Sequence, residues 1–141
     1  MKKILIINSN YYKNISKNLL QSAKNRLKKE KFKINILDVQ GVHEIPYAIR
    51  KNIKKFDGFV VLGCVIKGET PHFELICSSS FNSILSLSIN FNKPIGNGII
   101  TALNMKQALQ RSNNFKNFKP NKGLEAASAV ISLINNVPKK I

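Results

Sequence analysis

Short apolar runs separated by polar and glycine-containing stretches divide this chain, and they predict strands at residues 4–8, 32–39, 59–66 and 94–101. The run at 59–66 is apolar almost throughout, which is typical of a strand covered on both faces. The run at 32–39 alternates apolar and polar residues with the two-residue period of a strand. The hydrophobic pattern therefore predicts four strands.

The segments between these runs carry apolar residues at helical spacing. In residues 15–29, the apolar positions 15, 19, 20, 23 and 27 recur on one face, with lysines opposite. Thr70 is expected to act as an N-cap, followed by Pro71 in the first helical turn. Besides 15–29, the expected helices are residues 46–54, 71–89, 105–111 and 123–134.

Strands that alternate with helices predict right-handed crossovers and a parallel sheet between two layers of helices. No linker, repeat or low-complexity tract divides residues 1–141, and this length suits one domain with a substantial core. We therefore expect a single-domain α/β protein. Its architecture would be a three-layer α/β/α sandwich with a four-stranded parallel sheet, which is flavodoxin-like.

The segment at residues 63–74 carries the strongest chemical signal. An apolar strand ends in a short turn that contains Gly68, and a helix starts near Pro71. The unpaired N–H groups and the positive dipole end of such a helix form an anion site. His72, one of two histidines in the chain, stands on that site. The segment therefore predicts phosphate binding beside a proton-transfer group, an arrangement that points to an enzyme.

Ligands of open α/β sheets bind beyond the carboxyl ends of the strands. Those ends hold Tyr11, Glu44 and His72, which bring an aromatic face, a carboxylate and an imidazole to one edge of the sheet. This combination suits a planar heterocycle with hydroxyl groups, together with a second substrate that carries phosphate. The segments concerned are residues 9–12, 41–44, 67–72 and 101–104.

The formal charge of +16 adds little to this interpretation. Only three of the 23 basic residues are arginines, lysines are spread over helices and turns, and only residues 115–122 interleave them with aromatics. Nucleic-acid-binding proteins instead concentrate basic and aromatic residues on one face. We expect no specific nucleic-acid partner, only non-specific binding of polyanions at low salt.

Cys64 and Cys77 match neither a zinc-binding pattern nor a disulfide framework, which predicts a reducing, cytoplasmic compartment. The apolar stretch that follows Met1 breaks at Asn8. It is too short for a signal peptide or a membrane span, so we expect no membrane association.

Residues 41–46 (GVHEIP), 62–74 (LGCVIKGETPHFE) and 121–127 (NKGLEAA) resemble lumazine synthase, the penultimate enzyme of riboflavin biosynthesis. The resemblance covers nearly the whole chain. It implies condensation of 5-amino-6-(D-ribitylamino)uracil with 3,4-dihydroxy-2-butanone 4-phosphate to 6,7-dimethyl-8-ribityllumazine, with release of phosphate and water and with no cofactor.

The same resemblance implies a homopentamer, or a multiple of pentamers, with sites between adjacent subunits. Arg111 and His72 would then come from the neighbour of the subunit that provides Glu44. The small-molecule substrates and further copies of the chain are therefore the expected partners.

The resemblance also assigns roles in binding the uracil substrate. Tyr11 would lie against the pyrimidine ring. Val42, His43 and Glu44 match the segment that holds the ribityl chain, where Glu44 would accept hydroxyl hydrogen bonds. The strand end whose backbone would contact the uracil edge is matched by Cys64, Val65 and Ile66.

Further roles concern the phosphate and the proton. Glu69 and Thr70 match the phosphate-binding amides, and Arg111 matches the phosphate-binding arginine. His72 matches the proton-transfer histidine, and Lys122 matches a lysine near the site. Glu69 is expected to contribute its backbone N–H and to aim its side chain away.

Three features depart from the family pattern. Asn97 stands where the family commonly has an aromatic from a neighbouring subunit, and loss of that ring would weaken uracil binding by about 0.5–1.5 kcal/mol. His43 replaces an aromatic that is usually apolar. The loop from Arg111 to Lys122 is a few residues longer than usual.

Other interpretations of these residues and of the whole chain remain open. Tyr12 is an alternative to Tyr11 as the aromatic of the site, and Arg111 is also an ordinary cation in the last turn of a helix. His72 alone resembles any exposed histidine at a helix start. A flavin- or lumazine-binding module without efficient turnover, and a basic nucleic-acid-binding protein, are the alternatives to an enzyme.

Overall fold

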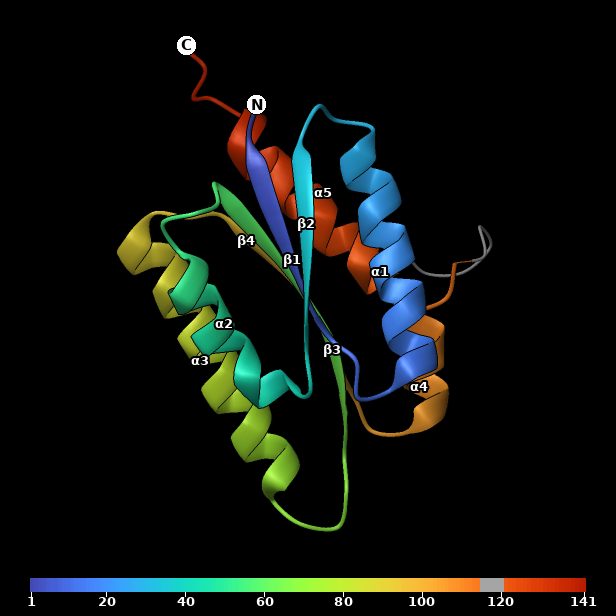
Figure 1. Cartoon of the computed structure of the whole chain (residues 1–141). Coiled ribbons are helices and arrows are strands. Elements are labelled where there is room, and N and C mark those ends of the chain that lie inside the picture. The colour runs from blue at the N-terminus through green and yellow to red at the C-terminus, as the bar shows by residue number, and fades with distance from the viewer. Residues whose placement is uncertain (115–120) are drawn as a thin grey trace.

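A computed structural model describes residues 1–114 and 121–141, and its strands form one parallel sheet in the order β2-β1-β3-β4 (Figure 1). The strand register pairs β1 with β2 and with β3, and β3 with β4, all in parallel. This is the strand order of the flavodoxin-like class, so the predicted fold is confirmed. The strands are β1 (Lys3–Ser9), β2 (Lys33–Val39), β3 (Gly58–Ile66) and β4 (Ile95–Ala102).

Helices cover both faces of this sheet (Figure 1). One layer contains α1, α4 and α5, and the other contains α2 and α3. None of these helices is both long and apolar enough to cross a membrane within the described residues. Their bounds are α1 (Lys13–Lys28), α2 (Ile45–Asn52), α3 (His72–Phe91), α4 (Met105–Arg111) and α5 (Lys122–Asn135), with a 3₁₀ turn, η1 (Val42–Glu44), before α2.

The apolar pattern of the strands divides the core into two clusters. In β1, Ile4 and Ile6 pack toward α1 and α5, whereas Leu5 and Ile7 pack toward α2 and α3. Residues 58–64 of β3 are buried without interruption because β3 is central and covered on both faces, as its continuous apolar run predicts. The edge strand β2 is mostly exposed.

The predicted start of α3 is wrong by one residue. Pro71, not Thr70, occupies the N-cap, and its ψ of 6° lies outside the helical range, so the helix begins at His72. Thr70 keeps part of the expected capping role, because its Oγ1 accepts the His72 N–H at 3.5 Å. The short helix α2 also ends at Asn52, before the predicted Lys54.

Close approach of α5 to β4 depends on one glycine. A Cβ atom added at Gly96 would lie 2.0 Å from the carbonyl oxygen of Ala126, so no other residue fits there without moving the helix. Asn121 caps the start of α5 by accepting the Gly123 N–H at 2.7 Å and the Leu124 N–H at 3.2 Å. The helix is thus fixed at both its start and its contact with the sheet.

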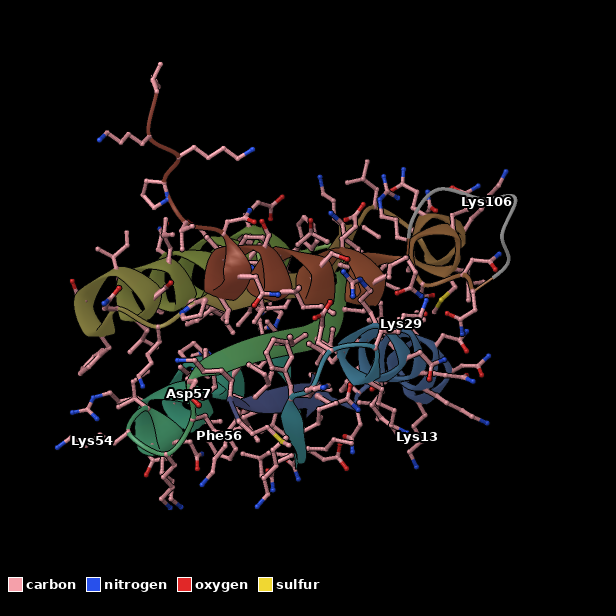
Figure 2. The ribbon with its side chains drawn as sticks, turned by 90° about the horizontal axis from the view of Figure 1, so that it is seen from above. Lys13, Lys29, Lys54, Phe56, Asp57 and Lys106 are labelled. Carbon is pink, nitrogen blue, oxygen red and sulfur yellow. The ribbon has the colours of Figure 1, made fainter. Side chains whose placement is uncertain are left out.

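Lysines project from several elements and in several directions (Figure 2). Lys13 begins α1 and Lys29 follows it, Lys54 lies after α2 at another corner, and Lys106 stands on α4. The charge is therefore not confined to one helix face. Most of the tract that interleaves lysines with aromatics, residues 115–120, and the predicted extra length of the loop before Lys122 lie outside the described residues.

Candidate active site

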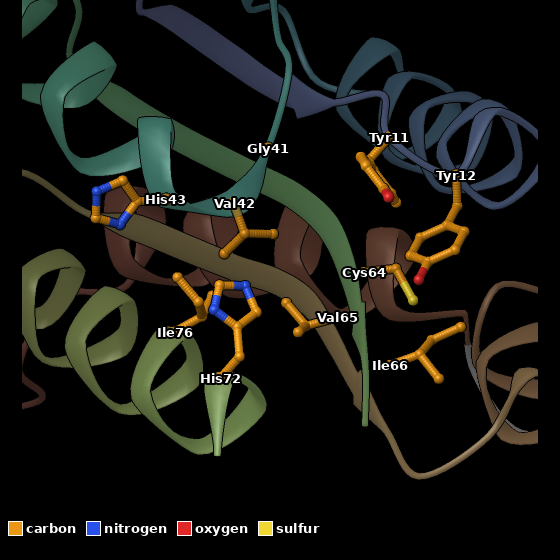
Figure 3. A pocket seen from close by; sticks show the side chains of 10 residues that line it. All are labelled: Tyr11, Tyr12, Gly41, Val42, His43, Cys64, Val65, Ile66, His72 and Ile76. Carbon is orange, nitrogen blue, oxygen red and sulfur yellow. The ribbon is translucent and has the colours of Figure 1, made fainter. Parts of the chain in front are cut away.

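The strand order reverses between β1 and β3, and this reversal creates the site. The chain leaves β1 toward α1 on one face of the sheet and leaves β3 toward α3 on the other (Figure 1). A crevice outside the carboxyl ends of the strands is expected where two such connections diverge. A cavity of about 520 Å³ lies there, lined by Tyr11, Tyr12, Gly41, Val42, His43, Cys64, Val65, Ile66, His72 and Ile76 (Figure 3).

Two tyrosines form one side of this cavity. Tyr11 and Tyr12 contact each other edge to face, with ring centroids 4.9 Å apart and an interplanar angle of 78°. Tyr11 is 72% exposed, whereas Tyr12 is half-buried and packs against the core cluster that includes Cys64. Tyr11 therefore offers an accessible aromatic face, and Tyr12 forms a wall.

A buried polar network holds the turn that carries the two tyrosines. The Ser16 hydroxyl lies 2.9 Å from both the Asn8 Oδ1 and the Ser9 carbonyl oxygen. Asn8 in turn donates from Nδ2 to Asp38 Oδ1 on β2 at 3.3 Å. The backbone N–H of Ser16 donates to the Tyr12 carbonyl at 2.9 Å. The end of β1 and the start of α1 are thus locked together.

Two histidines form the opposite side of the cavity. His43 lies on η1 and His72 is the first residue of α3; both are exposed (Figure 3). The Val42 side chain lies beside the His72 imidazole (Figure 3), and the close approach of Val42 to β3 depends on Gly63. A Cβ atom at Gly63 would lie 2.8 Å from Val42 Cγ2. Ile76 stands one helical turn after His72 and shares its face.

The end of β3 forms the floor. Cys64 faces the α1 side of the sheet and Val65 the α2 and α3 side, because successive strand residues point to opposite faces. Pairing with β1 stops at Leu62, whereas pairing with β4 continues to Ile66. Backbone groups of residues 63–66 on the edge toward β1 therefore have no strand partner and can bind a ligand.

Burial raises the pKa values of two groups that line the cavity, the Cys64 thiol and the Tyr12 hydroxyl. Burial raises the pKa of the Cys64 thiol from 9.0 to about 11, so the side chain is a neutral thiol at neutral pH. The pKa of Tyr12 is also raised, first by burial and then by Cys64 and Tyr11. Cys64 is therefore a poor nucleophile, and Tyr12 keeps its proton for hydrogen bonding.

The predicted anion site lies beside the cavity. In the described part of the chain, the amides of Gly68, Glu69 and Thr70 donate to no protein acceptor, and all three residues are exposed just before α3. Lys67 Nζ lies 3.7 Å from Glu74 Oε1 in the first turn of the helix. Free amides at a helix start suit a phosphate group.

Several predicted site residues do not line the cavity of their own chain. Glu44 is exposed, and its Oε2 would lie 2.9 Å from a Cβ added at Gly41. Arg111 donates from Nη1 to the Gln107 carbonyl at 3.2 Å. Lys122 pairs with Glu125 at 3.1 Å. Glu69 and Thr70 lie beside the cavity without lining it.

Asn97 also lies apart from the cavity. Its Oδ1 accepts the Ile99 N–H at 2.9 Å, so the side chain satisfies an amide of the edge strand β4. It borders a second cavity of about 270 Å³ between α3 and β4, together with Phe81, Asn82, Ile84, Leu85, Ser88 and Ile95.

The cavity corrects one expectation and adds three residues. His72 lines the same cavity as Val42 and His43 of its own chain, so it does not depend on a neighbouring subunit to reach the Glu44 segment. Among the added residues, Tyr12 was predicted only as an alternative to Tyr11, because both tyrosines follow the end of β1. Gly41 and Ile76 are the other two.

Comparison with known proteins identifies the family. The family model described as 6,7-dimethyl-8-ribityllumazine synthase matches residues 1–137. A protein of that name from Bartonella henselae is 42% identical over 135 residues, covering 93% of this chain and 85% of the relative. Proteins of the same name from Zymomonas mobilis and Campylobacter jejuni are 37% and 35% identical, covering 96% and 94% of this chain and 96% and 88% of the relatives.

Proposed function

This chain belongs to the 6,7-dimethyl-8-ribityllumazine synthase family, and we propose that it carries out the family's condensation in the cavity at the carboxyl ends of β1 and β3. The enzyme joins 5-amino-6-(D-ribitylamino)uracil to 3,4-dihydroxy-2-butanone 4-phosphate in the penultimate step of riboflavin biosynthesis. The observation that carries the site assignment is that Tyr11, Val42, Cys64 and His72, matched to the family motif, line one cavity.

The uracil substrate fits the floor and the aromatic side of this cavity. The ring would lie against the exposed face of Tyr11, with its polar edge toward the unpaired backbone of Cys64, Val65 and Ile66. The ribityl chain would extend toward Val42 and His43. Glu44 would accept ribityl hydroxyl hydrogen bonds after its exposed side chain turns from Gly41.

Proton transfer is the role proposed for His72. The substrate amine attacks the ketone to give an imine with loss of one water, phosphate leaves by elimination, and closure of the second ring onto the remaining carbonyl releases a second water. Each step moves a proton, and an imidazole on the cavity wall can accept it and return it. Such general acid–base catalysis contributes typically about 10²–10⁴-fold.

Phosphate departs as an anion and needs positive partners. The free amides of Glu69 and Thr70 at the start of α3 supply two donors. Arg111 would add a bidentate, charged contact, and Lys122 a further cation near the site. Neither lines the cavity of its own chain, so we propose that both reach it from an adjacent subunit.

We propose a homopentamer, or a multiple of pentamers, as the working assembly. Exposed apolar side chains on α3 support an oligomer, because Leu75, Leu85 and Ile89 are 65%, 60% and 69% exposed in the single chain. A symmetric ring of identical contacts would also repeat the shared site at every interface. We propose a cytoplasmic location, since both cysteines are free.

Steady-state formation of the fluorescent lumazine product from the two substrates tests the function. Wild-type protein is expected to form product, His72→Ala mainly to lower kcat, and Arg111→Ala mainly to raise the KM for the butanone phosphate. Asn97 favours one alternative, a module that binds flavin without efficient turnover. Tight riboflavin binding with no product would support that alternative and overturn the catalytic proposal.

A further inference from the structure

We propose that Tyr12 is a specificity-determining residue of this cavity, and that its hydroxyl donates a hydrogen bond to a ring carbonyl oxygen of the bound pyrimidine. The inference rests on the proposed function for the identity of the ligand. It adds one polar contact to the proposed site. The resemblance to the family assigns Tyr11 to the pyrimidine ring and assigns no role to the Tyr12 hydroxyl.

The position of Tyr12 aims its hydroxyl at the floor. Its ring extends from the start of α1 along the cavity, and the hydroxyl ends beside Cys64 (Figure 3). Cys64 begins the segment of β3 whose backbone edge toward β1 is unpaired. The hydroxyl and the free backbone groups therefore converge on the same edge of a flat ligand.

The hydroxyl is available to a ligand. Among the residues that the structure describes, no protein atom forms a hydrogen bond with the Tyr12 hydroxyl. Of its near neighbours, the Cys64 thiol is only a weak hydrogen-bonding group, and the Ile66 side chain forms no hydrogen bonds. A half-buried phenol in such surroundings gains most from a partner that comes with the ligand. The raised pKa of Tyr12 keeps the proton that this bond needs.

The backbone under Tyr12 is fixed before the ligand arrives. Ser16 donates its N–H to the Tyr12 carbonyl, and its hydroxyl lies 2.9 Å from groups of Asn8 and Ser9. Because the backbone that carries the Tyr12 hydroxyl is already fixed, less conformational entropy is lost when this donor binds a ligand.

Tyr11 provides a matched contrast in the same turn. Its ring touches Tyr12 edge to face, but it is 72% exposed, so water can satisfy its hydroxyl. Removal of either hydroxyl leaves an aromatic ring in place. The two Tyr→Phe substitutions therefore differ only in which hydroxyl is lost.

The test compares Tyr12→Phe with Tyr11→Phe in the full-length protein. We measure the KM for ribitylaminouracil, the KM for the butanone phosphate and the dissociation constant of riboflavin. Tyr12→Phe is expected to raise the uracil KM and weaken riboflavin about 2–10-fold, with the butanone phosphate KM unchanged. Tyr11→Phe keeps the ring proposed to lie against the pyrimidine and is expected to change each value by a smaller factor than Tyr12→Phe. Tyr47→Phe, at an exposed tyrosine of α2 that does not line the cavity, is the control and should leave each value unchanged.

A substrate analogue in which one ring carbonyl is replaced by hydrogen completes a thermodynamic cycle. For the carbonyl that Tyr12 contacts, the difference between wild type and Tyr12→Phe disappears with the analogue. Equal uracil KM and riboflavin affinity in wild type and Tyr12→Phe would overturn the inference. If wild-type protein forms no product, the proposed function fails, and the riboflavin comparison still decides the role of Tyr12. Circular dichroism of both variants checks that the fold is retained.

Discussion

The cavity at the carboxyl ends of β1 and β3 and the surface that carries Asn97, Arg111 and Lys122 are built in different ways. The cavity residues lie just after β1 and β2, at the end of β3 and in the first two turns of α3, so the fold of one chain brings them together. The other three side chains bond within their own segments and line no part of that cavity. One chain thus forms the heterocycle half of the proposed site, and we infer that the phosphate half is completed by quaternary structure.

Complementation between two inactive variants is the strongest test of whether His72 and Arg111 of different subunits share one site. His72→Ala alone is expected to lose about 10²–10⁴-fold in kcat, and Arg111→Ala alone to be poorly active at ordinary substrate concentrations. In a mixed ring, about a quarter of the interfaces would join an intact His72 to an intact Arg111, so mixing and reassembling the two variants should restore about a quarter of wild-type activity.

A mixture of His72→Ala with His72→Asn is the matched control, because no pairing restores the imidazole. It should stay at the level of either variant. If the His72→Ala and Arg111→Ala mixture gains nothing over its components, although analytical ultracentrifugation detects mixed oligomers, the shared site is wrong.

Alkylation of Cys64 tests whether its thiol is buried in the cavity floor and whether the ligand covers it. Because burial raises its pKa from 9.0 to about 11, its thiolate population at pH 8 is about 100-fold below that of an ordinary thiol. Reaction with iodoacetamide, followed by mass spectrometry of the Cys64 peptide, should be slow at pH 8 and should accelerate until the pH approaches 11. Riboflavin should slow it further. Unchanged labelling at saturating riboflavin would place the ligand elsewhere.

The raised pKa of Cys64 also makes the free energy of unfolding depend on pH. The folded chain holds the Cys64 proton more tightly than the unfolded chain, so the free energy of unfolding should fall as pH rises from about 9 toward 11. Below pH 9 both states are protonated and the contribution is constant. Urea titrations at several pH values should detect a smaller alkaline loss in Cys64→Ala than in wild type.

Asn97 tests whether the outer surface meets the heterocycle. If β4 of one subunit borders the cavity of the next, Asn97→Phe supplies a stacking ring and should tighten riboflavin by about 0.5–1.5 kcal/mol, or roughly 2–12-fold. Asn97→Ala removes the bond to the Ile99 amide without adding a ring, so it controls for that loss. Equal riboflavin affinity in Asn97→Phe and Asn97→Ala would mean that β4 of one subunit does not border the cavity of the next.

Glu69 carries the smallest expected effect. Its backbone N–H, not its carboxylate, is assigned to phosphate, and the side chain is exposed. Glu69→Gln should therefore change the KM for the butanone phosphate by less than about 2-fold, a change typical of a surface substitution. A large change in phosphate affinity would mean that the carboxylate faces the anion.

The fold was predictable because the periods in this sequence are unambiguous. The apolar run that forms β3 identified the central strand, and the helical spacing from Ile15 to Leu27 identified α1. Boundaries were less predictable, since they depend on local dihedral angles. Pro71 illustrates this: the sequence placed it inside the helix, whereas its ψ of 6° places it before the first turn.

The site was predictable only where strand ends determine it. Tyr11 lies just after β1, and His72 begins the helix that follows β3, so topology alone brings them to one edge. Tyr12 was predicted only as an alternative because a residue pair offers no signal of which ring turns inward. In the proposed oligomer, the positions of Arg111 and Asn97 relative to the ligand would depend on contacts between copies, which neither the sequence pattern nor a single chain contains.

The divergence of the connections after β1 and β3 also has an evolutionary consequence. Several cavity residues, such as Val42 and Cys64, also belong to the two apolar clusters that stabilise the chain, whereas Tyr11 and His43 are exposed and belong to neither. Substitutions at Tyr11 and His43 can therefore change which heterocycle is accepted without removing core contacts. Changes among the many surface lysines likewise leave the cavity intact, because no lysine of the described residues lines it.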